Sequence, residues 1–66
     1  MHLSVNGTTR TCPEGLSMLE LVKELGLPPE KIVVERNLSI VPADLFAKTI
    51  LQDADTIEIL QFVGGG

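Results

Sequence analysis

The feature that most constrains the fold is one short apolar stripe at helical spacing, with strand patterns on both sides. Met18, Leu21, Val22 and Leu25 recur at i, i+3, i+4 and i+7, the apolar face of an amphipathic helix of about two turns. No second stripe of this kind is present. A chain of 66 residues with one short helix must build the rest of its core from strands.

Residues that begin and end a helix frame this stripe. Ser17 and Glu20 form a capping-box pattern, which satisfies two backbone amides at a helix start. Gly26 can end the helix in the left-handed conformation, and Pro28-Pro29 prevents the helix from resuming. The sequence therefore predicts a single helix between Ser17 and Gly26.

Strand patterns occur before and after this helix. Leu3-Ser4-Val5 and the run Thr8–Cys12 flank Asn6-Gly7, the pair that a type I′ hairpin turn favours. Further elements are predicted as strands at Ile32–Glu35, Ile40–Val41 and Thr56–Val63, and as one helical turn at Ala43–Lys48 that buries Leu45 or Phe46.

The order strand, strand, helix, strand, short strand, strand predicts an α+β fold. Parallel first and last strands at the centre of a mixed sheet, crossed by one helix, give every apolar stripe a partner. This arrangement is the β-grasp, with four to five strands over residues 1–63 and a flexible glycine tail at 64–66. A ferredoxin-like fold needs a second full helix between Val41 and Thr56, and Pro42 leaves little room for one.

Charge and composition exclude several classes of protein. The formal net charge of -4 argues against nucleic-acid binding, which requires clustered Lys and Arg. No apolar run approaches the roughly 20 residues that cross a bilayer, and the N-terminus lacks a signal-peptide pattern, so we expect a cytoplasmic protein without membrane contact. Because Cys12 is the only cysteine and His2 has no ligand nearby, we expect no disulfide and no metal. We interpret Cys12 as a small packed residue.

Gly64, Gly65 and Gly66 directly follow the last predicted strand. Glycines at this position add no packing and lose more conformational entropy on ordering than other residues, so they indicate a purpose other than folding. The alternative is that they are an incidental frayed tail. A backbone without Cβ atoms can enter a narrow slot. Extended from Val63, it would carry the Gly66 carboxylate on the order of 13 Å beyond the sheet.

A carboxylate becomes an acyl donor only after activation. Adenylation by ATP supplies a leaving group, after which a sulfur nucleophile can attack the acyl carbon. The chain has no glycine-rich loop with the Lys and Ser/Thr that cradle phosphates. We therefore expect a carrier and substrate of another enzyme, with no cofactor bound by the chain itself.

The sequence resembles the thiamine-biosynthesis sulfur carriers of the ThiS family, relatives of ubiquitin, over nearly its whole length. Matching stretches are Val5-Asn6-Gly7, Leu19–Val22, Val34–Asn37, Ile40–Pro42, Asp53–Ile59 and Phe62–Gly66. The sequence departs from the family pattern at Leu38 and Ala54, where Gly is frequent. The resemblance implies that a ubiquitin-activating-type enzyme using ATP and magnesium adenylates the terminal Gly65-Gly66, with Gly64 as an extension. It also implies conversion to a thiocarboxylate and sulfur donation to thiazole synthase.

Alternation in the last strand indicates a docking surface. If Ile57 and Ile59 face the core, Leu60 and Phe62 face outward, next to Val33 on the neighbouring strand. We predict that Val33, Leu60, Phe62 and Val63 bind the partner enzymes, while Glu35 and Glu58 set the orientation through charge.

Three alternatives remain open from the sequence. The chain could be a carrier of the type of the small subunit of molybdopterin synthase, a protein modifier conjugated to lysines, or a non-covalent interaction module. We expect a monomer when the carrier is free. Isolated exposed apolar residues without function are the alternative to the docking surface.

Overall fold

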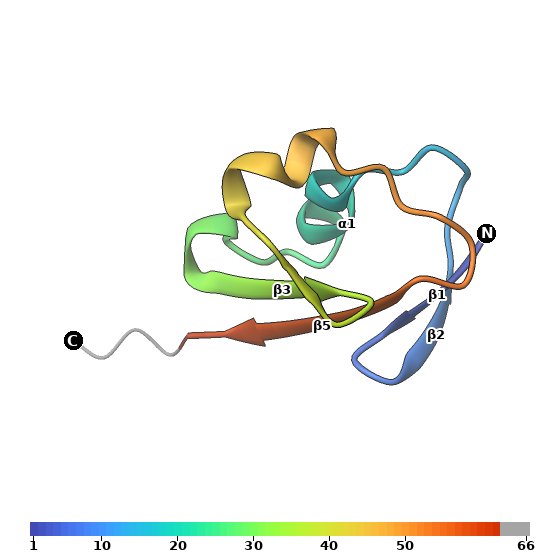
Figure 1. The fold of residues 1–66 in the computed structure, drawn as a ribbon, viewed down its shortest axis with the longest axis horizontal. Helices are drawn as coiled ribbons and strands as arrows, with labels where there is room; N and C mark the ends of the chain where they lie inside the picture. Colours follow the sequence, from blue (N-terminus) through green and yellow to red (C-terminus); the bar gives the residue numbers. More distant parts are fainter. Residues whose placement is uncertain (63–66) are drawn as a thin grey trace.

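One mixed sheet of five strands forms one layer of the protein, and helical segments pack on one of its faces (Figure 1). The computed structural model describes residues 1–62, so the predicted tail at 64–66 and the predicted site residue Val63 lie outside the described residues. The elements are β1 (His2–Val5), β2 (Thr8–Thr11), α1 (Met18–Glu24), η1 (Pro29–Lys31), β3 (Ile32–Arg36), β4 (Ser39–Val41), η2 (Ala43–Lys48) and β5 (Thr56–Gln61), where η denotes a 3-10 helix.

The strand order is β2-β1-β5-β3-β4, with the last strand of the chain at the centre. β1 runs parallel to β5, with Ser4 opposite Thr56, whereas all other neighbouring strands are antiparallel. Only a crossover connection can join parallel neighbours, and α1 lies on this connection. The predicted β-grasp is confirmed.

Two hairpins turn through the left-handed region of backbone space. Asn6 and Gly7 have φ of 49° and 81°, so the predicted turn between β1 and β2 is confirmed. Between β3 and β4 the corresponding residues are Asn37 and Leu38, with φ of 50° and 73°. Leu38 thus adopts a conformation that glycine tolerates better, at one of the two positions where the sequence departs from the pattern of the family that it resembles.

The helix α1 begins and ends as predicted. The Glu20 amide donates to Ser17 Oγ (3.1 Å), and the Ser17 amide donates to Glu20 Oε1 (3.0 Å), which completes the capping box. Hydrogen bonding by Ser17, first of all by its backbone amide, lowers the pKa of the Glu20 carboxyl below its ordinary value. Gly26 follows with φ of 72°, the left-handed conformation expected just beyond a helix end.

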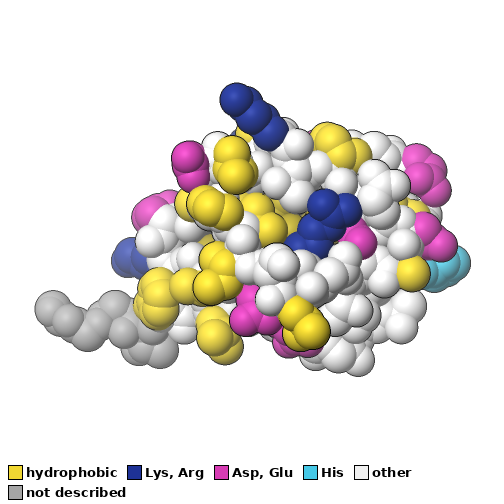
Figure 2. All heavy atoms as spheres, in the orientation of Figure 1, with side chains coloured by type: hydrophobic (Ala, Val, Ile, Leu, Met, Phe, Trp, Pro, Cys, Tyr) yellow, Lys and Arg dark blue, Asp and Glu magenta, His cyan; other side chains and the backbone are white. Residues whose placement is uncertain are grey.

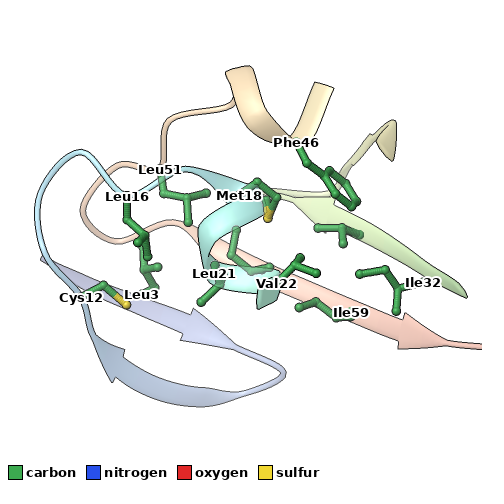
Figure 3. Close-up of a cluster of buried hydrophobic side chains, with 12 residues drawn as sticks. Leu3, Cys12, Leu16, Met18, Leu21, Val22, Ile32, Phe46, Leu51 and Ile59 are labelled. Carbon is green, nitrogen blue, oxygen red and sulfur yellow. The ribbon is translucent and has the colours of Figure 1, made fainter. Parts of the chain in front are cut away.

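The core lies between the sheet and the helical layer (Figure 3). It is built from Leu3, Cys12, Leu16, Met18, Leu21, Val22, Ile32, Val34, Phe46, Leu51, Ile57 and Ile59. The prediction that Cys12 is a packed residue is confirmed. η2 decides which of two neighbours is buried, because Phe46 is 1% exposed and Leu45 is 44% exposed.

Some element bounds differ from the prediction. β5 ends at Gln61, although the amide of Phe62 still donates to the carbonyl oxygen of Lys31 (2.8 Å). η1 was not expected, and it begins where Pro29 fixes φ near the helical value. Within residues 1–62 no helix is both long enough and apolar enough to cross a membrane.

Candidate partner-docking site

The central strand β5 sends alternate side chains to opposite faces of the sheet. Ile57 and Ile59 are buried in the core, whereas Leu60 is 69% exposed and, just after the strand, Phe62 is 57% exposed. The predicted outward orientation of Leu60 and Phe62 is therefore confirmed. Large apolar side chains remain uncovered on the outer face, where the last strand ends.

Val33 lies beside these two residues. In the antiparallel register of β3 and β5, Val33 is directly opposite Leu60, and it is half-buried. We call Val33, Leu60 and Phe62 the exit patch. Hydrophobic side chains gather at the left of the view in Figure 2, where β5 ends in Figure 1. The structure thus places three of the predicted docking residues together, and their binding role stays a prediction.

The sequence reasoning missed Ile40 as an extension of this surface. Ile40 lies opposite Glu35 in the register of β3 and β4, and it is 66% exposed. Its neighbour Val41 packs against the core, so Ile40 must face outward. The same alternation rule that found Leu60 could have found Ile40, had the pairing of the two strands been known.

Two carboxylates lie next to the exit patch. Glu35 is directly opposite Glu58 in the register of β3 and β5, and neither is in an ion pair with a residue among 1–62. Like charges at such a pair disfavour the sheet. The pair therefore gives the outer face a local negative charge.

The start of β5 is held by a buried carboxylate. Asp55 accepts hydrogen bonds from Arg36 Nε (2.8 Å), Asn37 Nδ2 (2.9 Å) and the Gln52 amide (2.8 Å). Burial acts to raise the pKa of Asp55. The bonds donated to the carboxylate outweigh burial, so that the pKa lies below its ordinary value.

The described residues offer no other chemical centre. Among residues 1–62 no three His, Cys, Asp or Glu side chains come together in a way that could hold a metal ion. Open hollows of about 380 Å³ lie beside Asn6 and beside Ile40, and neither of these is lined by a residue of the exit patch. The predicted reactive residues Gly64, Gly65 and Gly66 lie outside the described residues.

A β-grasp sheet with one crossing helix and an apolar patch at the end of its central strand defines a small protein of the ubiquitin type. A sequence model of the ThiS family matches residues 3–66, and the chain belongs to this family.

Relatives support this assignment. The crystal structure of the thiamine biosynthesis protein ThiS from Geobacter metallireducens superposes with a TM-score of 0.85, at 36% identity and over 100% of both chains. The sulfur carrier protein ThiS of Escherichia coli is 30% identical, again over 100% of both chains.

Two further relatives are longer proteins. The chain is 41% identical to a segment of the thiazole synthase of Paramagnetospirillum magneticum and 36% identical to a segment of that of Magnetococcus marinus. In each case 100% of this chain matches 20% of the relative. The chain therefore spans about a fifth of the length of these two relatives.

Proposed function

We propose that the chain is a sulfur carrier in the formation of the thiazole ring of thiamine, and that the carboxylate of Gly66 carries the sulfur. Support comes from membership of the ThiS family and from a full-length relative named as a sulfur carrier. The single structural observation that carries the proposal is the exit patch at the end of β5. In the sequence this patch comes just before the three glycines, so a partner that binds the patch binds next to the segment that carries the reactive carboxylate.

The proposed chemistry proceeds in three displacements. A Gly66 carboxylate oxygen attacks the α-phosphorus of ATP, and pyrophosphate leaves. The terminal sulfur of a donor persulfide then attacks the acyl carbon, AMP leaves, and an acyl disulfide forms. A thiolate next attacks the donor's sulfur of this acyl disulfide, so that a new disulfide forms and the thiocarboxylate leaves. The resulting thiocarboxylate keeps its charge on a polarizable sulfur, which makes it a better nucleophile than the original carboxylate. ATP and magnesium are bound by the activating enzyme, since this chain has no phosphate-binding loop.

The partners are a ubiquitin-activating-type enzyme and a thiazole synthase, and both dock on the exit patch. The two long relatives support the second partner, since a segment similar to this chain is part of polypeptides named thiazole synthase. The outer face is polar over β1 and β2, where it presents Ser4, Thr9 and Thr11. Among residues 1–62, the large exposed apolar side chains of this face thus lie on the half around β5, β3 and β4, as a localised binding surface requires.

Intact mass spectrometry tests the carrier function. The chain is incubated with ATP, magnesium, a candidate activating enzyme and a sulfur source, and we expect replacement of one terminal oxygen by sulfur. A chain lacking Gly66 should stay unmodified. An unchanged mass of the complete chain under conditions that load the Escherichia coli carrier would contradict the proposal, and isopeptide-linked adducts would indicate a protein modifier instead.

Substitutions in the exit patch test docking separately. Leu60→Ser and Phe62→Ser should each raise the KM of the activating enzyme for the carrier about tenfold or more, since each removes an exposed apolar contact. Leu45→Ser is the matched control, because Leu45 is also partly exposed but lies in η2. Wild-type kinetics for both patch variants would remove the exit patch from the proposal.

A further inference from the structure

β1 leaves the sheet before its neighbour β5 ends. Val5, the last residue of β1, is opposite Ile57, and the Asn6 amide donates to the carbonyl oxygen of Ile57 (2.9 Å). β5 continues to Gln61. Beyond Ile57, the central strand therefore has a neighbouring strand on the β3 side only.

The side chain of Asn6 takes the place of the missing strand at one position. Asn6 Oδ1 accepts a hydrogen bond from the Ile59 amide (2.7 Å), and Asn6 Nδ2 donates to the Ile59 carbonyl oxygen (3.2 Å). A carboxamide carries the same donor and acceptor pair as a peptide group. Asn6 thus satisfies both backbone polar groups of a buried residue, 53 positions away in the sequence.

The hairpin turn alone does not require this side chain. At φ of 49°, Gly, Asn and Asp all meet the conformational demand of the first turn residue. Glycine would leave Ile59 without either bond, and an aspartate carboxylate could accept from the amide but could not donate to the carbonyl. The two bonds to Ile59 therefore explain why Asn in particular is useful at this position.

We propose that Asn6 is a positioning residue for the carrier reaction. By holding Ile59 it fixes the backbone immediately before Leu60 and Phe62, and with it the direction in which the chain leaves the sheet. This inference rests on the proposed function. A preorganised exit strand lowers the ordering cost of docking, so the contribution of Asn6 should appear in KM rather than in kcat.

Two variants separate the side chain from the turn. Asn6→Gly keeps a residue that accepts positive φ and removes both bonds, whereas Asn6→Asp keeps the acceptor only. Ser17→Ala is the matched control, because it removes the helix cap and destabilises the fold without touching β5. Amide hydrogen exchange at Ile59 and steady-state adenylation are measured for all four proteins.

We expect Asn6→Gly to speed exchange of the Ile59 amide about fivefold relative to exchange of the Val34 amide, because this is the factor that corresponds to the loss of one typical hydrogen bond. Its KM for adenylation should rise several-fold at nearly constant kcat, with Asn6→Asp intermediate and Ser17→Ala unchanged. Wild-type KM in Asn6→Gly, or an equal rise in Ser17→Ala, would overturn the positioning role. Failure of the wild-type chain to be adenylated would instead overturn the proposed function. The exchange measurement needs no enzyme, and unchanged exchange of the Ile59 amide in Asn6→Gly would by itself overturn the inference about Asn6.

Discussion

At the scale of single residues, Asp55 ties the turn between β3 and β4 to the start of β5. Its carboxylate is buried and accepts three hydrogen bonds, two of them from Arg36 and Asn37. Asp55→Ala should lower the free energy of unfolding by about 2–4 kcal/mol, because it leaves these donors unpaired. Urea unfolding measures the change, with Asp44→Ala at an exposed site as the control. Equal stability of the two variants would refute this role.

The same residue predicts how stability depends on pH. The pKa of Asp55 is lower in the folded protein than in the unfolded chain, so unfolding takes up protons in acid. The stabilising contribution is complete above the ordinary pKa of Asp, about 3.9, and is lost as the pH falls through the lower folded pKa. Asp55→Asn should reduce the fall of the urea midpoint as the pH is lowered. Parallel pH profiles of the urea midpoint for the variant and the wild type would contradict this role of Asp55.

Ala54 stands in a backbone conformation that suits glycine. Its φ is 70°, in the turn that leads into β5. Ala54→Gly should raise the free energy of unfolding by about 0.5–1 kcal/mol, because it relieves left-handed strain that exceeds the added entropy of the unfolded chain. Ala47→Gly, in η2 and without positive φ, should have the opposite sign. Thermal unfolding of the two variants measures both changes. If both variants changed the free energy of unfolding in the same direction, the explanation by backbone strain at Ala54 would be wrong.

At the scale of elements, η2 closes one end of the core with a single side chain. Phe46 is buried in the core cluster, which includes residues of α1, whereas its neighbour Leu45 is 44% exposed. Phe46→Ala should cost about 3–5 kcal/mol, the range for a buried aromatic residue, and Leu45→Ala under about 1 kcal/mol. Chemical denaturation compares the two, and similar losses would show that η2 does not anchor the core through Phe46.

At the scale of the whole molecule, the outer face combines features that a free protein would avoid. Glu35 opposite Glu58 adds to a net charge of -4, and the exit patch lies beside this pair. The facing like charges disfavour the isolated fold, and the exposed apolar patch disfavours its solubility. They become favourable when a partner covers the patch and supplies cationic groups.

Glu58→Gln tests this trade-off. The variant should be more stable than the wild type by about 0.2–1 kcal/mol, since one of two facing like charges is removed. Its association with the proposed activating enzyme should be slower and less sensitive to salt. Glu24→Gln removes the same charge at an exposed position at the end of α1, away from Glu35, and is the charge-matched control that should leave the association rate unchanged. Stopped-flow association at several salt concentrations gives the answer, and an unchanged rate for Glu58→Gln would exclude the orienting role.

The sequence by itself determined the local features of this protein. Asn6-Gly7, the Ser17–Glu20 capping box and Gly26 act over a few residues, so their conformations follow from local sterics and hydrogen bonding. The alternation of Ile57, Ile59, Leu60 and Phe62 likewise indicated which face each would occupy, and the structure agrees. The family assignment needed only the order of such stretches.

Tertiary structure decided the features that depend on partners distant in sequence. Nothing local shows that Asn6 bonds Ile59, that Asp55 gathers Arg36 and Asn37, or that Ile40 joins the outer surface opposite Glu35. The choice between Leu45 and Phe46 also depended on where η2 meets the core. Such contacts are set by strand order and register, which fix which residues meet only once the whole sheet has formed.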